Sequence, residues 1–222
     1  MLCVDCVNQA RKQARPVRSR LGFTGAGKPP YVTYGLIIAN IAAYIYGTFV
    51  IGTNQWILDW GLFPGVTEGL FSLGTDPYRW ITSGFLHFGL WHIGLNMFVL
   101  WQFGTQLEPA MGRWRFAGVY LVGLLGSSAA VVLLGGAGSV HGGASGAIFG
   151  VIAAYAIALY KLKLPWQSVA VSAGLWLVLG FVVGGVSWQG HLGGAIGGAI
   201  AMLAMLHWVD RKSPATKQSS GW

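Results

Sequence analysis

Four long stretches of the chain carry no lysine, arginine, aspartate or glutamate, and this feature restricts the fold more than any other. They cover residues 29–58, 80–107, 116–160 and 164–209. A helix that crosses a bilayer needs about 20 mainly apolar residues, so each of the first two stretches holds one crossing. The last two are roughly twice as long and each holds two. With 54% hydrophobic and 9% charged residues, the 222-residue chain is typical of a membrane protein.

Glycine-rich or polar breaks divide the two longest stretches. The sequence GGAGSVHGG interrupts the third stretch, and GGVSWQG interrupts the fourth. We therefore predict an all-α membrane protein, a bundle of six transmembrane helices. The predicted spans are 34–52, 88–106, 116–134, 145–160, 166–183 and 189–209.

Basic residues lie almost entirely on one side of the predicted spans. They precede the first span or follow the second, fourth and sixth: Arg11, Lys12, Arg15, Arg18, Arg20, Lys28, Arg113, Arg115, Lys161, Lys163, Arg211, Lys212 and Lys217. Only Arg79 falls on the other side. Because cytoplasmic loops carry the positive excess, both termini are predicted to be cytoplasmic. The net charge of +8 then reflects topology in a lipid bilayer, and we expect no nucleic-acid partner.

The segments outside the spans are short. Residues 1–30 form a basic cytoplasmic segment, with a flexible linker over 10–30; residues 31–210 form the membrane domain; and 211–222 form a disordered cytoplasmic tail. No signal peptide is expected. Cys3 and Cys6 form a C-x-x-C pair, half of a zinc site that needs four ligands. Two other interpretations of the pair are a free dithiol in a basic tail and the remnant of a zinc-ribbon head. We expect no other cofactor.

Two small-residue helix faces each carry one polar residue. Gly190, Gly194 and Gly198 follow one face of the sixth span, which opens with His191, and Gly142, Gly146 and Gly150 form a matching series around Ser145. Such faces let helix backbones approach closely. We predict that the glycines bring Ser145 to His191, a base that can activate the hydroxyl as a nucleophile. Alternatively, Ser145 is a packing residue and His191 an interfacial histidine.

Two further polar residues open the second span. His92 and Asn96 are one helical turn apart on one face, and both can donate hydrogen bonds. Together with the backbone N–H of Ser145, they could stabilise the oxyanion formed when a nucleophile attacks an amide. His87 lies on another face, where we expect it to tie the preceding loop to the helix. His207, at the cytoplasmic end of the last span, is expected to be interfacial.

Taken together, these segments resemble the rhomboid family of intramembrane serine proteases. The shared motifs are HFGLWHIGLNM, GGASGAIFG and GHLGGAIGG, supported by Tyr78-Arg79 and by Glu108, Gly112, Arg115 and Phe116. The resemblance implies a rhomboid-like six-helix bundle with a Ser145–His191 dyad and no acidic third member. The acidic residues after Asp5 all lie outside the predicted spans, in agreement. Phe149 replaces the family's tyrosine, so it can stack on His191 but offers no hydroxyl.

The resemblance also implies a function. We expect an intramembrane serine endopeptidase, multi-pass in the cell membrane, that cleaves transmembrane protein substrates from the non-cytoplasmic face. A hydrated cavity formed by the glycine-rich loop 135–143, which ends at Gly143, would supply water. The loop 53–79 is expected to dip into the outer leaflet, and the helix 166–183 to admit substrate. The alternatives are a catalytically inactive rhomboid-like protein that binds transmembrane helices, and a transporter or channel, for which mid-membrane charges are missing.

Overall fold

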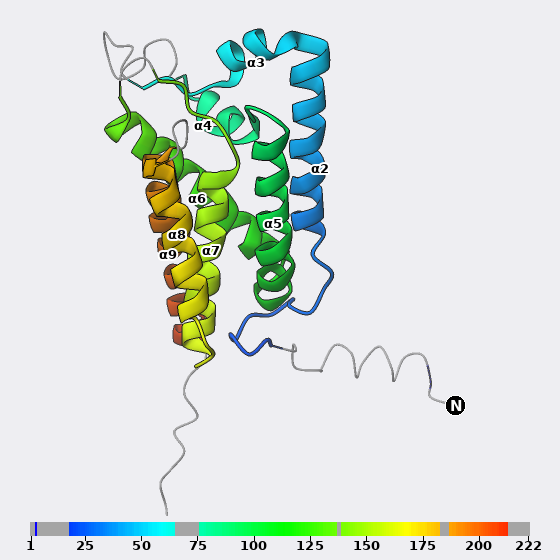
Figure 1. Ribbon diagram of the computed structural model, residues 1–222. Coiled ribbons are helices and arrows are strands. Elements are labelled where there is room, and N and C mark those ends of the chain that lie inside the picture. The colour runs from blue at the N-terminus through cyan, green and yellow to red at the C-terminus, as the bar shows by residue number, and fades with distance from the viewer. Residues whose placement is uncertain (1–2, 4–17, 65–75, 137–138, 183–186, 213–222) are drawn as a thin grey trace, which may run out of the picture.

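The computed structural model describes residue 3 and residues 18–64, 76–136, 139–182 and 187–212, and within these ranges it contains helices but no β-strand. The α-helices are α2 (Tyr31–Tyr46), α3 (Thr53–Trp60), α4 (Arg79–Thr82), α5 (Leu90–Met111), α6 (Arg113–Leu134), α7 (Ser145–Lys161), α8 (Gln167–Val182) and α9 (Trp188–Lys212) (Figure 1). A π-helical turn, η1 (Gly47–Gly52), joins α2 to α3, and a 3₁₀ turn, η2 (Ser83–Phe85), follows α4.

Six of these helices occupy the positions that the hydrophobic stretches predict. They are α2 and α5 to α9, and their ends lie within six residues of the predicted ones. By length and composition, three helical segments of the described residues could cross a membrane: Tyr31–Trp60, Arg113–Leu134 and Trp188–Arg211. The prediction of an all-helical membrane protein is therefore confirmed.

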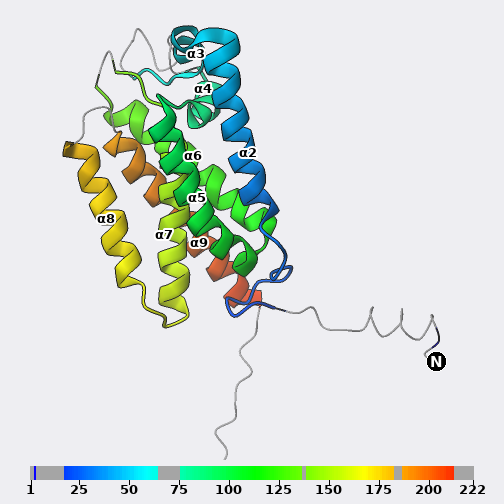
Figure 2. The ribbon, with the colours of Figure 1, turned by 45° about the vertical axis from the view of Figure 1, so that its right-hand side comes forward.

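Three helices form the centre of the bundle. α6, α7 and α9 pack against one another along most of their lengths, whereas α2 packs mainly on α5. α8 lies at the edge, beside α7 and α9, with much less contact (Figure 2). The tight centre therefore contains the two helices on which the sequence places Ser145 and His191.

Glycine forms the contact between α7 and α9. A Cβ added at Gly150 would lie 2.9 Å from the Gly194 carbonyl oxygen, and one at Gly146 would lie 3.2 Å from the Gly190 carbonyl oxygen. A Cβ at Gly198 would fall on the backbone of Gly150. Backbones this close leave no room for side chains, which is how small residues join membrane helices. The predicted close approach of these two helices is confirmed.

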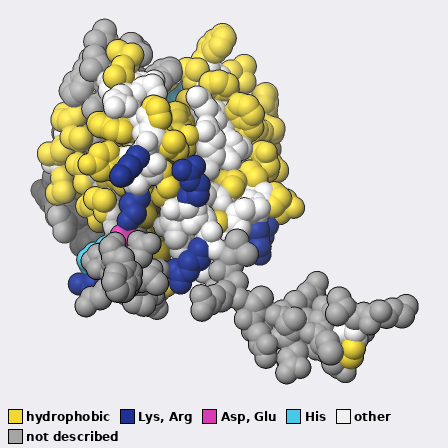
Figure 3. Space-filling model, turned by 90° about the horizontal axis from the view of Figure 1, so that it is seen from below, with side chains coloured by type: hydrophobic (Ala, Val, Ile, Leu, Met, Phe, Trp, Pro, Cys, Tyr) yellow, Lys and Arg dark blue, Asp and Glu magenta, His cyan; other side chains and the backbone are white. Residues whose placement is uncertain are grey.

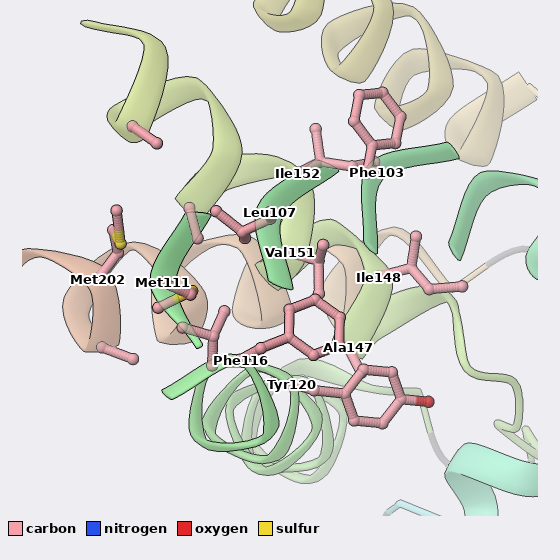
Figure 4. Close-up of a cluster of buried hydrophobic side chains, with 14 of the residues drawn as sticks. Phe103, Leu107, Met111, Phe116, Tyr120, Ala147, Ile148, Val151, Ile152 and Met202 are labelled. Atoms are coloured by element: carbon pink, nitrogen blue, oxygen red, sulfur yellow. The ribbon is translucent and has the colours of Figure 1, made fainter. Parts of the chain in front are cut away.

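α6 joins the same contact and extends it into an apolar core. Gly123 lies against Gly150, and Gly126 against the backbone of Gly193. Figure 4 shows Phe116 of α6 and Val151 of α7 within one larger buried cluster. The three central helices are thus held by backbone contact between glycines and by packing of buried apolar side chains.

Glu108 fastens α2 to α5. Its buried carboxylate accepts hydrogen bonds from the backbone N–H of Val32 (3.0 Å) and of Thr33 (2.7 Å), and from the Thr33 hydroxyl (2.8 Å). These are first-turn groups of α2, which lack partners inside the helix and favour a negative charge. The sequence places Glu108 beyond the second span. That placement is wrong, because α5 continues to Met111.

Basic side chains gather at the end of the bundle where α7 and α9 finish, as the view from that end shows (Figure 3). Residues 18–30 pack beneath this end, with Leu21 and Phe23 buried in the core. The Arg115 guanidinium lies 4.9 Å from the Phe23 ring centroid and donates a hydrogen bond to the Thr24 carbonyl oxygen (2.8 Å). A flexible linker over residues 10–30 is therefore wrong for the part described, because two apolar side chains anchor it.

We predict that Gly198→Ala destabilises the protein, because the added methyl group would overlap Gly150. Overpacking of this kind costs about 1–3 kcal/mol. The matched control is Gly35→Ala in α2, where a Cβ meets nothing within 4 Å and where alanine favours the helix. Thermal unfolding in detergent should show a lower midpoint for Gly198→Ala only. Equal midpoints for the two variants would contradict the contact.

Candidate active site

Ser145 and His191 meet at one end of the glycine contact. Ser145 is the first residue of α7, and His191 lies in the first turn of α9. The Ser145 Oγ and His191 Nε2 atoms are 2.9 Å apart, which is hydrogen-bonding distance. The imidazole is largely shielded, with 6% of the residue exposed. Two side chains far apart in the sequence thus form the contact that a nucleophile and its base require.

The His191 ring is oriented by stacking. The Phe149 ring, one helical turn after Ser145, lies 4.3 Å from it between centroids, with the planes inclined by 19°. The Nδ1 atom of His191 is buried and has no hydrogen-bond partner among the described residues. No carboxylate there holds the imidazole as an aspartate does in a serine-protease triad. The orientation of His191 therefore depends on Phe149, on Ser145 and on the position of α9.

A small polar cavity borders the pair. Its volume is about 30 Å³, and Ser145 and His191 are both part of its wall. A cavity needs about 10–15 Å³ on this scale to hold one water molecule, together with polar partners. The other polar side chains in the wall are Ser83, Ser127, Ser128, His141 and Ser187. The site therefore has room for water beside Ser145.

His92 faces the loop that carries Ser145. The backbone N–H of Phe88 donates to His92 Nδ1 (3.3 Å), which leaves the proton of a neutral imidazole on Nε2. A Cβ added at Gly143 would lie 2.9 Å from His92 Nε2 and 3.6 Å from Ser145 Oγ. Gly143 also has a φ of +129°, which favours glycine. A side chain at this position would therefore occupy space that His92 and Ser145 both border.

Asn96 points its amide elsewhere. Its Nδ2 donates to the His92 carbonyl oxygen (2.8 Å), within its own helix. At most one N–H of the buried amide is then available to another acceptor. Neither His92 nor Asn96 belongs to the wall of the cavity. The oxyanion role of Asn96 stays a prediction.

His87 is buried beside His92 in the segment before α5. Its Nδ1 donates to the Phe85 carbonyl oxygen (3.2 Å), and its ring packs edge-on to His92 at 5.0 Å. Burial, and secondarily the neighbouring His92, lower the pKa of His87 from 6.5 to about 3. His87 is therefore neutral near pH 7, and it acts as a packing partner of His92 with no contact to Ser145.

Several features of the site differ from the sequence analysis. Gly142 does not continue the glycine face of α7, because it precedes the helix and a Cβ there would meet Leu86. Five polar residues of the cavity wall were not singled out: Ser83, Ser127, Ser128, His141 and Ser187. His141 could have been recognised as part of the site because it lies in a glycine-rich segment four residues before Ser145. A connection between two helices can be made of small residues alone, so a histidine in it is unusual.

Arg79 holds the described part of the connection between α2 and α5, which we call the first loop. Its guanidinium donates to the carbonyl oxygens of Leu58 (2.6 Å) and Gly61 (2.9 Å) and pairs with Asp76 (3.1 Å).

His207 is exposed near the end of α9. Cys3 is exposed, whereas Cys6 lies outside the described residues, so the predicted half zinc site stays a prediction.

The apolar helices and the glycine-packed bundle define an integral membrane protein. The rhomboid domain matches residues 74–208, which is more than half of the chain and includes Ser145 and His191. The chain belongs to the rhomboid family.

Curated relatives carry names from the same family. The rhomboid protease GluP of Bacillus subtilis (strain 168) is 34% identical over 147 residues, covering 64% of this chain and 28% of that protein. The rhomboid protease GlpG of Photorhabdus laumondii is 28% identical over 156 residues, covering 68% and 51%. The rhomboid-type serine protease 2 of Emericella nidulans is 33% identical over 141 residues, covering 58% and 27%. The match thus spans about a quarter to a half of each relative.

Proposed function

We propose that this protein is an intramembrane serine endopeptidase of the rhomboid type, with Ser145 as nucleophile and His191 as base. The observation that carries the proposal is the 2.9 Å contact between Ser145 Oγ and His191 Nε2 at the meeting point of two glycine-packed helices. The names of its relatives support the same activity. An inactive helix-binding protein has less support, because both groups are present and in contact.

The reaction follows from the order of proton transfers. His191 Nε2 takes the proton of the Ser145 hydroxyl as Oγ attacks the scissile carbonyl carbon. The imidazolium then gives that proton to the leaving amine, and the C–N bond breaks to leave an acyl-enzyme. Water from the adjacent cavity, activated by the same imidazole, hydrolyses the ester and restores Ser145. Phe149 keeps the ring in place through these steps.

The oxyanion is stabilised by donors near the Ser145 hydroxyl. The backbone N–H of Ser145 is at the start of α7, where N–H groups lack partners inside the helix and the dipole favours negative charge. His92 Nε2–H borders the same small space across Gly143. Asn96 joins them if its amide turns away from the His92 carbonyl oxygen when substrate binds.

We further propose that six helices cross the cell membrane, with both termini cytoplasmic. Ser145 opens α7 and Lys161 ends it, while His191 lies in the first turn of α9 and Arg211 in its last. The positive end of the bundle is thus opposite to the dyad, which supports an active site toward the non-cytoplasmic face. The substrates are membrane proteins whose transmembrane helix unwinds locally, since helical amides are hydrogen-bonded and shielded.

Substitution of either member of the dyad tests the proposal. In proteoliposomes with a single-span reporter protein, Ser145→Ala and His191→Ala should each lower the cleavage rate by roughly a thousand-fold or more, because nucleophile and base act as a unit. His207→Ala, which changes an exposed histidine at the far end of α9, should cleave at the wild-type rate. Cleavage that survives either dyad substitution would disprove the mechanism.

Gly143→Ala should lower kcat by about a hundred-fold, as the loss of an oxyanion donor does, because its methyl group would fill the space between His92 and Ser145. The matched control is Gly136→Ala in the same loop, where a Cβ meets nothing within 4 Å. Initial rates at saturating reporter separate the two variants. A Gly143→Ala enzyme as fast as Gly136→Ala would show that this space is not used in the reaction.

A further inference from the structure

His141 connects the loop that carries the nucleophile to the helix that carries the base. It lies four residues before Ser145, and its backbone is fixed to the first loop by two hydrogen bonds. The Leu62 N–H donates to the His141 carbonyl oxygen (3.0 Å), and the His141 N–H donates to the Leu62 carbonyl oxygen (2.8 Å). Two residues later, the Gly143 N–H donates to the Ser83 carbonyl oxygen (2.8 Å). The backbone on which His141 stands is therefore held firmly on one side.

The imidazole of His141 reaches across to the start of α9. Its Nδ1 lies 2.8 Å from Ser187 Oγ, and its Nε2 lies 2.9 Å from Ser139 Oγ. Ser187 immediately precedes α9, and its hydroxyl oxygen accepts the backbone N–H of Gly190 (3.2 Å). This is the N-cap arrangement, in which a serine satisfies an N–H of the first helical turn. His141 thus contacts the residue that fixes how α9 begins.

The surrounding groups determine which atoms donate. Ser139 donates its hydroxyl proton to the Gly136 carbonyl oxygen (2.6 Å), so its oxygen accepts from His141 Nε2–H. His141 Nδ1 then accepts, and the Ser187 hydroxyl donates to it. The chain of bonds is complete with a neutral imidazole and needs no other partner. Burial lowers the pKa of His141, which favours this neutral form.

The base has particular need of such support. His191 is the residue just after Gly190, and its own N–H donates to the Ser187 carbonyl oxygen (3.1 Å). Its Nδ1 has no hydrogen-bond partner among the described residues. No hydrogen bond from that atom therefore holds the ring in its orientation if α9 shifts or turns. Small displacements of a catalytic group are costly in rate. The position of the first turn of α9 is therefore part of the orientation of His191.

We propose that His141 is a positioning residue of this active site: acting through Ser187, it keeps the first turn of α9, and hence His191, in register with the loop that presents Ser145. The inference rests on the proposed peptidase function. It assigns His141 no contact with substrate and no proton transfer in the reaction. In a serine-protease triad, an acid contacts the catalytic histidine directly and orients it. Here His141 orients His191 indirectly, through Ser187 and the first turn of α9.

The test compares three substitutions at one position. His141→Phe keeps a ring but removes both hydrogen bonds, and His141→Ala removes both the ring and the bonds. His141→Gln supplies a donor NH₂ group and an acceptor oxygen in place of the two ring nitrogens. With the single-span reporter, we expect kcat to fall about ten-fold or more for the first two, with KM nearly unchanged, because orientation and not binding is lost. The Gln variant should recover most of the wild-type kcat.

A double-mutant cycle identifies the route. If His141 acts through Ser187, then His141→Ala combined with Ser187→Ala should be no slower than the slower single variant. Ser139→Ala, which loses only the contact remote from α9, should have the smaller effect. Thermal midpoints measured on all variants separate orientation from stability: the His141→Phe and His141→Gln enzymes should unfold at similar temperatures although their kcat values differ.

Three results would overturn the proposal. They are a wild-type kcat in His141→Phe, additive losses in the double variant, or a Gln enzyme as slow as the Phe enzyme. Failure of the underlying function has a different signature: either the wild-type protein does not cleave the reporter, or Ser145→Ala still cleaves it, whatever residue occupies position 141.

Discussion

The close contact of the α7 and α9 backbones is the constraint on which the rest of the structure depends. Gly150 and Gly198 touch without any side chain between them, and Gly146 and Gly194 do the same one turn nearer to the dyad. A membrane offers little hydrophobic force to join two apolar helices, so close packing of small residues must supply the attraction. Because the helices are locked at this distance, the first turn of each can place a side chain against the other.

The chemistry proposed for the site follows from this fixed distance between α7 and α9. A hydroxyl and an imidazole 2.9 Å apart need no mobile segment to bring them together, and preorganised groups avoid the cost of ordering during the reaction. Among the described residues, no carboxylate orients His191, and the fixed positions of α7 and α9 make such a partner unnecessary. Phe149 fixes the plane of the ring, and the helix itself fixes its position. The loop before α7 is in turn fixed to the first loop through Leu62 and Ser83.

Much of this could be predicted from the sequence, because the responsible patterns are local and repetitive. Uncharged stretches with glycine-rich breaks predicted the positions of the six long helices, and glycines spaced four apart predicted which helices meet. The sequence did not predict that Phe23 packs beneath the bundle, that Glu108 belongs to α5, or that Asn96 donates to its own helix. These depend on contacts between distant segments or on a side-chain rotamer. His141 was treated as part of a break, although a polar ring near a nucleophile needs partners.

The most direct test of the account is to map the residue that a fluorophosphonate modifies. Such a reagent phosphonylates an activated hydroxyl, with loss of fluoride, when a base removes the hydroxyl proton, so peptide mass spectrometry of the treated protein reports the contact. The account predicts a single adduct on Ser145 in the wild-type protein, and labelling slower by about a hundred-fold or more in His191→Ala. An unmodified Ser145, or equal labelling rates in both proteins, would contradict it.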